Sequence, residues 1–452
     1  MFESINPASG ALIHTYPETP NVEDCIERSH RCWEGYRRTP FAERAAKLKV
    51  LADLLHTNRE KLGLLMTLEM GKKTAEALAE VDKCAWACTY YADHAEFFLQ
   101  NEVIDTDASL SYVACEPLGV ILAVMPWNFP FWQVFRFAAP ALMAGNTALL
   151  KHASNVSGCA LAIQDLFRQA GFPEDAFITL LIPSSKVRDV IAHPRVKAIT
   201  LTGSDGAGRS VAAEAGKQLK KCVLELGGSD PYLILADADI DLAVKTCVQS
   251  RLINAGQSCI AAKRFIIVPE VYDAFAKQFV QAMQAIGMGD PSSPDTGIGP
   301  LARLDLRDDL HDQVVRSVAM GAKILLGGRI PIGEGAFYPP TVLGNVTPDM
   351  PAFEEELFGP VAPLIRAESE EHAIALANDS VFGLGAAVFS RDQEKAKRIA
   401  QYEVQAGSCF VNGLVKSDPR LPFGGINLSG FGRELSHHGI MEFVNVKTVW
   451  MK

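Results

Sequence analysis

The stretch GVILAVM at residues 119–125 is an uninterrupted apolar run, and it opens a part of the chain in which such runs alternate with helix-like segments. Strands that are covered on both faces are apolar along their whole length, so this alternation predicts a parallel, doubly wound α/β sheet. Ligands bind such sheets beyond the carboxyl ends of the strands, so the residues after each run are the candidate site. Four more runs follow, at residues 146–151, 177–182, 196–201 and 222–226.

Further layers are predicted on either side of this sheet. Upstream, after a short opening strand, apolar residues at helical spacing predict helices over residues 40–70 and from 74 to about 99. Downstream, a second α/β block begins near Gly228. A chain of 452 residues is too long for one core, so we expect two or three domains. In the second block we predict strands at 264–268, 323–326 and 361–366, and helices near 272–285, 305–319 and 370–377.

The composition is that of an ordinary globular protein, with 48% hydrophobic residues, 21% charged residues and a formal net charge of −10. The acidic balance argues against a nucleic-acid or anionic membrane partner and favours small-molecule chemistry. No apolar run reaches the roughly 18 residues of a membrane span, and the start MFESINP lacks the layout of a signal peptide, so we expect a cytosolic protein. The ten cysteines form no Cys-x-x-Cys pair, which supports neither a disulfide framework nor a metal site.

The segment NAGQSCI at residues 254–260 is the candidate catalytic loop. Its Cys259 follows a glycine and two polar residues, between a helix-like stretch and the strand at 264–268. A cysteine in such a loop is reachable, and backbone N–H groups can support the charge of its thiolate. The alternative is a buried structural thiol, which is favoured for any one of ten cysteines taken alone. The assignment therefore depends on which other residues the chain brings to Cys259.

Two strand ends carry polar residues suited to a site. Asn128, in the turn PWNFP at residues 126–130, could donate to a developing oxyanion, although an asparagine that only fixes the turn is the simpler interpretation. Lys151 and Ser154 follow the second strand and supply a cation and a hydroxyl for ribose or phosphate oxygens. A lone lysine is more often a solvated charge.

Three further segments carry weaker indications. TGSDGAG at residues 202–208 could present N–H groups to a phosphate, but it lacks the Gly-x-Gly-x-x-Gly spacing. Glu225, followed by two glycines, is a candidate base, and a solvated glutamate is equally common. Glu356 and Phe358 could hold a ribose and a flat heterocycle, whereas a charge run of this kind is usually a solvated face.

Taken together and in this order, the motifs resemble the aldehyde dehydrogenase superfamily over essentially the whole chain. One such motif would be a weak indication, but seven in order and at compatible spacing are specific. The position of Arg136, eight residues beyond Asn128, resembles the arrangement in the succinate-semialdehyde dehydrogenase branch of this superfamily. The motifs are PWNFP at 126–130, the strand end at Lys151, TGS at 202–204, ELGG at 225–228, GQSC at 256–259, EELFGP at 355–360, and PFGG with SGxGRE at 422–434.

The resemblance implies oxidation of an aldehyde through a thioacyl enzyme. Cys259 would attack the carbonyl, the Asn128 amide and the Cys259 N–H would hold the oxyanion, and Glu225 would activate the hydrolytic water. The cofactor would be NAD or NADP, because Ser154 stands where relatives strict for NAD usually have a glutamate. The implied cofactor-binding residues are Trp127, Lys151, Ser154, Gly203, Ser204, Gly208, Leu226, Glu356 and Phe358.

The branch implies succinate semialdehyde as the substrate, with Arg136 binding its carboxylate beside Trp132. The alternative for Arg136 is a pair with an internal carboxylate. The chain departs from the branch at Ile253, where relatives often have an arginine six residues before the nucleophile. We expect Ser417 or Arg420 to supply the missing contact.

The resemblance also implies a domain layout and an assembly. Residues 1–99 and 118–227 would form the dinucleotide-binding domain and residues 228–430 the catalytic domain. Residues 100–117 and 431–452 would supply the strands of a homodimer or homotetramer. Three alternatives stay open: a CoA-acylating aldehyde dehydrogenase, against which Glu225 argues, a non-catalytic binding or structural protein on the same fold, and a cysteine hydrolase without a redox role.

Overall fold

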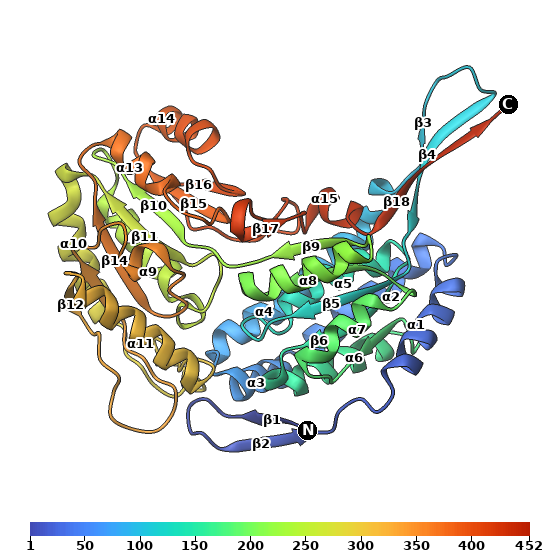
Figure 1. Ribbon diagram of the computed structural model, residues 1–452, viewed down its shortest axis with the longest axis horizontal. Coiled ribbons are helices and arrows are strands. Elements are labelled where there is room, and N and C mark those ends of the chain that lie inside the picture. Colours follow the sequence, from blue (N-terminus) through green and yellow to red (C-terminus); the bar gives the residue numbers. More distant parts are fainter.

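The predicted parallel sheet forms the centre of one of the two lobes of the computed structural model, which describes residues 1–452 (Figure 1). Five of its strands run parallel, and the two-residue β17 adds to one edge antiparallel to β9. The expectation of a doubly wound α/β sheet is therefore confirmed. The order is β17 (Gly430–Phe431), β9 (Lys221–Glu225), β8 (Val196–Thr202), β5 (Val120–Met125), β6 (Thr147–His152) and β7 (Phe177–Thr179).

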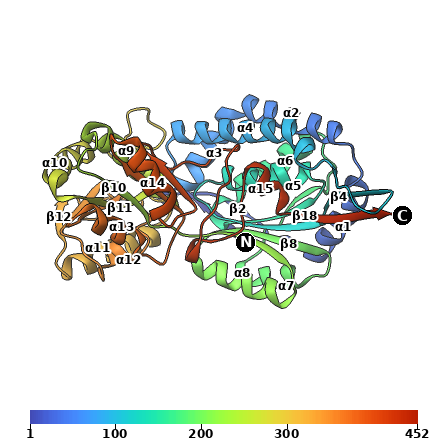
Figure 2. The same cartoon turned by 90° about the horizontal axis from the view of Figure 1, so that it is seen from above.

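Helices cover both faces of this sheet, which explains why its strands are apolar throughout. The apolar sides of α1, α7 and α8 pack on one face. On the other face lie α5 and α6, backed by α2, α3 and α4. Figure 2 shows α2 and α4 on one side and α7 and α8 on the other. The bounds are α1 (Val22–Tyr36), α2 (Phe41–Thr57), α3 (Arg59–Met70), α4 (Thr74–Phe98), α5 (Trp132–Met143), α6 (Ser157–Gln169), α7 (Val187–Ala192) and α8 (Asp205–Lys217).

The second lobe is built on a seven-stranded sheet with its own apolar core. Only β12, at one edge, runs antiparallel to its neighbour. The strand order is β12 (Lys323–Leu326), β13 (Thr341–Gly344), β14 (Val361–Arg366), β11 (Ala262–Ile267), β10 (Asp230–Ile234), β15 (Gly385–Phe389) and β16 (Ser408–Val411). The helices are α9 (Ile240–Leu252), α10 (Pro269–Gln284), α11 (Leu304–Ala319), α12 (Pro351–Glu354), α13 (Glu370–Asn378) and α14 (Gln393–Arg398).

A three-stranded arm projects from the first lobe and carries the C-terminus (Figure 1). In it β4 (Leu110–Pro117) lies between β3 (Glu102–Val103) and β18 (Val444–Met451), with all eight residues of β18 in register. The helix α15 (Ser436–Met441) leads into the arm, and a hairpin of β1 (Phe2–Ile5) and β2 (Leu12–Tyr16) precedes α1. None of the helices has the length and apolar content needed to cross a membrane.

Candidate active site

The loop that carries Cys259 has an unusual backbone. After α9 ends at Leu252, the residues Asn254, Ala255 and Gly256 all have positive φ angles, of 52°, 54° and 80°. At Gly256 this conformation is combined with a close approach, because a Cβ there would collide with the carbonyl group of Gly359. The turn therefore requires glycine at this position.

Buried hydrogen bonds hold this loop in place. Arg251 Nη2 donates to the carbonyl oxygen of Gly256 at 2.7 Å and to that of Leu357 at 3.3 Å. The backbone N–H of Asn254 donates to Glu76 of α4 at 3.1 Å. Contacts from both lobes thus fix the backbone on which the nucleophile is carried.

Cys259 lies half-buried in the wall of a cavity of about 540 Å³. Burial raises the pKa of its thiol to about 12, and the nearby Arg136 and Lys263 oppose this shift. The thiol is therefore the dominant form in this conformation. Lys263 is fully buried and donates to the carbonyl oxygens of Ser258 and Cys259 at 2.9 and 2.7 Å.

Asn128 lies directly against the Cys259 loop. Its side-chain Nδ2 donates to the backbone carbonyl oxygen of Gln257 at 3.1 Å, and its backbone carbonyl oxygen accepts from Asn254 Nδ2 at 2.7 Å. A primary amide has two N–H groups, so one donor remains after the bond to Gln257. The geometry places a fixed amide donor beside the loop of Cys259, as an oxyanion site requires.

Glu225, the last residue of β9, is a buried carboxyl group whose two oxygens have no hydrogen-bond partner in the protein. Burial raises its pKa well above the ordinary value, and Arg136 is the main opposing charge. Glu225 also lies near enough to Cys259 to act on the pKa of its thiol. A buried carboxyl group with such a shift is typical of a group that exchanges protons during a reaction.

Arg136 on α5 lines the cavity, but its guanidinium is already paired. Its Nε forms a buried ion pair with Glu434, and its Nη2 donates to Thr202 Oγ1 at 3.2 Å. The structure thus contains the internal pair that was the alternative for this residue. Glu434, the last residue of the SGxGRE motif, was not assigned a role from the sequence, because its partner lies almost three hundred residues earlier.

Three of the expected cofactor residues, Trp127, Glu356 and Phe358, make contacts between segments that are distant in the sequence. Glu356 accepts from the backbone N–H of Gly228 at 3.1 Å and pairs with Lys263 at 3.1 Å. Trp127 and Phe358 meet edge to face, with ring centroids 5.8 Å apart. Segments distant in the sequence are thereby joined around Glu356.

The glycine-rich turn after β8 is shaped for close packing. Ser204 caps α8, accepting from the N–H of Ala207 at 3.3 Å. A Cβ at Gly208 would meet the side chain of Leu226 at 2.6 Å, so the helix lies tightly against the residue that follows Glu225. Gly203, by contrast, has room for a Cβ.

Lys151 is buried at the end of β6 and forms neither an ion pair nor a side-chain hydrogen bond. Burial lowers its pKa. Ser154, three residues later, is exposed. An unpaired, largely buried cation beside an exposed hydroxyl fits a negatively charged or hydroxyl-rich ligand, since the protein itself supplies no counter-ion.

The expected substrate residues divide into two groups. Trp132 and Ser417 line the cavity together with Cys259. Arg420 does not line it; its guanidinium is bound by the carboxylate of Asp418, through contacts of 2.9 and 2.7 Å. Of the two residues expected from this loop, Ser417 is therefore the one that lines the cavity. Lys83 of α4, which was not singled out from the sequence, also lines the cavity.

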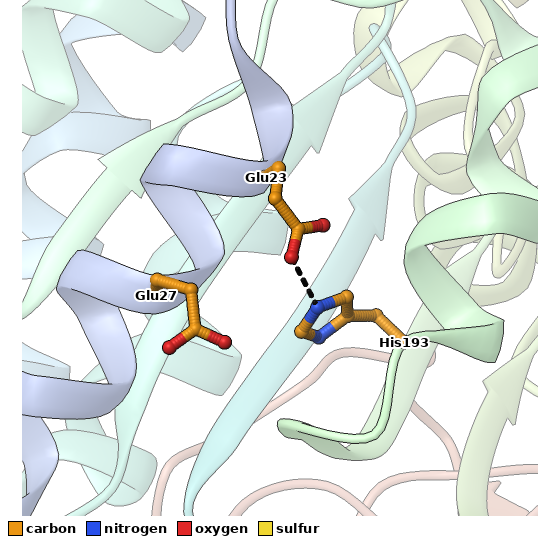
Figure 3. A group of neighbouring side chains, drawn as sticks. All are labelled: Glu23, Glu27 and His193. Atoms are coloured by element: carbon orange, nitrogen blue, oxygen red, sulfur yellow. Dashed lines mark hydrogen bonds and ion pairs between the residues drawn. The ribbon is translucent and has the colours of Figure 1, made fainter.

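One group of potential metal ligands lies far from the cavity, on α1 and the loop after α7 (Figure 3). His193 Nε2 bonds to Glu23 at 3.0 Å, and its Nδ1 accepts the N–H of Arg195 at 3.2 Å. Glu27 accepts from Arg195 Nε at 3.4 Å. Each member is thus satisfied by a neighbour, and the group forms an ordinary surface ion-pair cluster.

The raised pKa of Cys259 predicts a characteristic alkylation profile for the free enzyme. Only the thiolate reacts, so the iodoacetamide rate at Cys259 should rise about tenfold per pH unit between pH 7 and pH 9 without reaching a plateau. Mass spectrometry of the modified peptide measures this rate, and Cys259→Ala is the control. A plateau below pH 9 would show that the thiol ionises more readily than its surroundings imply.

Comparison with known proteins agrees with this geometry. The chain matches the aldehyde dehydrogenase family over residues 1–449. It is 52% identical, over 99% of each chain, to a Synechocystis protein named a probable succinate-semialdehyde dehydrogenase (NADP+). It is 49% identical, again over 99% of each chain, to succinate-semialdehyde dehydrogenase (NADP+) 1 of Mycobacterium tuberculosis. The succinic semialdehyde dehydrogenase of Streptococcus pyogenes, solved with NADP+, superposes with a TM-score of 0.97 at 40% identity and full coverage of both chains. A chain with this fold, these motifs and these relatives belongs to the aldehyde dehydrogenase family.

Proposed function

We propose that the protein oxidises succinate semialdehyde to succinate with NADP or NAD. The observation that carries this proposal is that Cys259 lines the cavity, while the Asn128 amide is bonded to the same loop and the buried carboxyl group of Glu225 lies near enough to act on the pKa of the Cys259 thiol. The names of the relatives support the substrate and NADP as the cofactor.

The first step is addition of Cys259 Sγ to the carbonyl carbon of the aldehyde. The free N–H of the Asn128 amide and the backbone N–H of Cys259 would stabilise the resulting oxyanion. Because Asn128 is fixed by its bond to Gln257, this donor requires little reorganisation as the charge develops. When bound, the cofactor supplies the hydride acceptor that converts the adduct into a thioester.

Hydrolysis of the thioester needs a base, and Glu225 is the available carboxyl group. Burial raises the pKa of Glu225 well above its ordinary value and so favours the protonated form of this carboxyl group. Entry of water would solvate the carboxylate and lower that pKa, which allows Glu225 to take a proton from the attacking water. A hydrolytic base of this kind favours release of a free acid over transfer to CoA.

Lys151 and Ser154 would bind the adenosine ribose of the cofactor. A lysine and a hydroxyl suit either a 2′-phosphate or a 2′-hydroxyl, and no carboxylate at Ser154 repels the phosphate. Glu356 would accept hydrogen bonds from the nicotinamide ribose, with Phe358 packing beside it. Trp127, Gly203, Ser204, Gly208 and Leu226 would complete the surface around these groups.

The arm of β3, β4 and β18 is proposed to join copies of the chain in a homodimer or homotetramer. Val446, Trp450 and Met451 are exposed on β18, and Val103 is exposed on β3. Exposed apolar side chains on an edge strand favour pairing with another sheet. We propose residues 1–99 and 118–227 as the dinucleotide-binding domain and residues 228–430 as the catalytic domain. Gly430 and Phe431 of β17 pair with β9, in the sheet of the first lobe.

The proposal predicts a specific substrate profile. With NADP, kcat/KM for succinate semialdehyde should exceed that for butanal by at least about tenfold, because one charged contact is worth more than about 1.4 kcal/mol. The formation of NADPH and of free succinate measures this, with Cys259→Ala as the control. A requirement for CoA would identify an acylating enzyme, and turnover without cofactor would identify a hydrolase.

Asn128→Ala should fold normally but lose about 100-fold or more in kcat, because one oxyanion donor is removed. Steady-state kinetics measures the loss, and circular dichroism with thermal denaturation checks the fold. Near-normal turnover in this variant would remove Asn128 from the proposed site.

Both cofactors should support turnover, with kcat/KM values that differ by less than about 1000-fold, or roughly 4 kcal/mol. Ser154→Glu should lower the NADP to NAD ratio by about tenfold or more, because its carboxylate repels the 2′-phosphate. Ser154→Ala, which adds no charge, is the matched control. An unchanged ratio in Ser154→Glu would show that the 2′-phosphate lies elsewhere.

A further inference from the structure

Three charged residues of α4 lie on the side of the helix that faces the cavity. Glu76, Glu80 and Lys83 are spaced i, i+4 and i+7, which places them on one face of the helix. All three line the cavity that contains Cys259. The helix would otherwise be interpreted as scaffold.

The two glutamates of this face already bind other groups of the protein. Glu76 accepts the N–H of Asn254. Glu80 forms a buried ion pair with Lys72 and accepts the N–H groups of Phe131 and Trp132, both at 2.9 Å. Glu80 thereby caps the start of α5. Neither carboxylate is left to neutralise Lys83.

Lys83 pairs with no carboxylate at all. Its Nζ donates to Ser417 Oγ at 2.7 Å and lies 4.2 Å from the centre of the Trp132 ring. Burial lowers the pKa of Lys83 to about 8, with Arg136 adding to the shift. A half-buried ammonium group that contacts only a hydroxyl and an aromatic face has donors left for an anion.

The other cations near the cavity are engaged or exposed. Arg136 is paired with Glu434, and its charge also acts on Glu225, so this group contributes no surplus positive charge. Lys73 lies beside Glu76, and Lys416 is exposed. Lys83 is the cation of the cavity wall whose ammonium group contacts Ser417 and Trp132 and no carboxylate.

We propose that Lys83, together with Ser417, binds the carboxylate of an ω-carboxy aldehyde while Cys259 attacks its carbonyl group. Ser417 Oγ accepts from Lys83, which leaves the serine O–H free to donate to the same carboxylate. The inference rests on the proposed function. It assigns the selection of the substrate charge to Lys83 and no longer to Arg136. Ile253, also in the cavity wall, offers no competing charge.

The test compares kcat/KM for succinate semialdehyde and butanal in the full-length enzyme with saturating NADP. Lys83→Met should lower the value for succinate semialdehyde on the order of 10- to 100-fold, through KM, because a charged hydrogen bond is lost. Butanal should change by less than about threefold, since it carries no carboxylate. Lys83→Arg should retain most of the selectivity, and Lys416→Met is the control that removes one cation of the same cavity.

A second measurement does not depend on turnover. Succinate should slow alkylation of Cys259 in the wild type, and this protection should be lost in Lys83→Met and kept in Lys416→Met. Lys83→Glu serves if Lys83→Met does not fold, and it should favour 4-aminobutanal over succinate semialdehyde.

The possible results distinguish the role of Lys83 from the proposed substrate of the enzyme. A wild type that prefers succinate semialdehyde, with unchanged selectivity in Lys83→Met, overturns the role of Lys83 alone. Loss of selectivity in Lys416→Met but not in Lys83→Met does the same. A wild type that oxidises butanal as efficiently as succinate semialdehyde overturns both this inference and the proposed substrate.

Discussion

The left-handed turn at Asn254–Gly256 is the constraint on which the site depends. Non-glycine residues in this conformation cost about 1–2 kcal/mol each, so neighbouring contacts must hold them. These contacts come from Glu76 on α4, from Asn128 after β5, and from Arg251 at the end of α9, while Gly359 leaves no space for a side chain. The position of the nucleophile is therefore set by parts of the chain that lie far apart in sequence, and the motifs have to occur together.

Because the site is buried, its positively charged side chains need counter-ions or other hydrogen-bond partners. A buried cation without a counter-ion is costly. Three buried cations here are paired with carboxylates, whereas Arg251 and Arg264 donate to backbone carbonyl oxygens. Lys83 and Lys151 have no carboxylate partner, and in the proposals above a ligand anion takes that place for each of them. The pairs are Arg136 with Glu434, Lys72 with Glu80, and Lys263 with Glu356.

Local pattern predicted much of the fold and only part of the site. The strands of the first sheet and the helix α4 were expected within a few residues, because burial imposes their periodicity. The strands β10, β13, β15 and β16 of the second lobe were missed, since each is only four or five residues long. Cys259, Asn128 and Glu225 follow from motif order. Lys83 did not stand out, because its significance lies in the absence of a partner, which only the tertiary structure reveals.

Arg136 also shows what sequence patterns cannot predict. Its spacing from Asn128 suggested a carboxylate clamp, and spacing cannot show that Glu434 returns to neutralise it. Substrate charge is selected by the net charge that the cavity wall leaves unpaired, and any residue lining the wall can supply it. In the proposal above, Lys83 on α4 takes the role that the sequence suggested for Arg136, while Cys259 stays on its own loop. The residue that selects the substrate charge and the loop that carries Cys259 are then separate parts of one cavity wall.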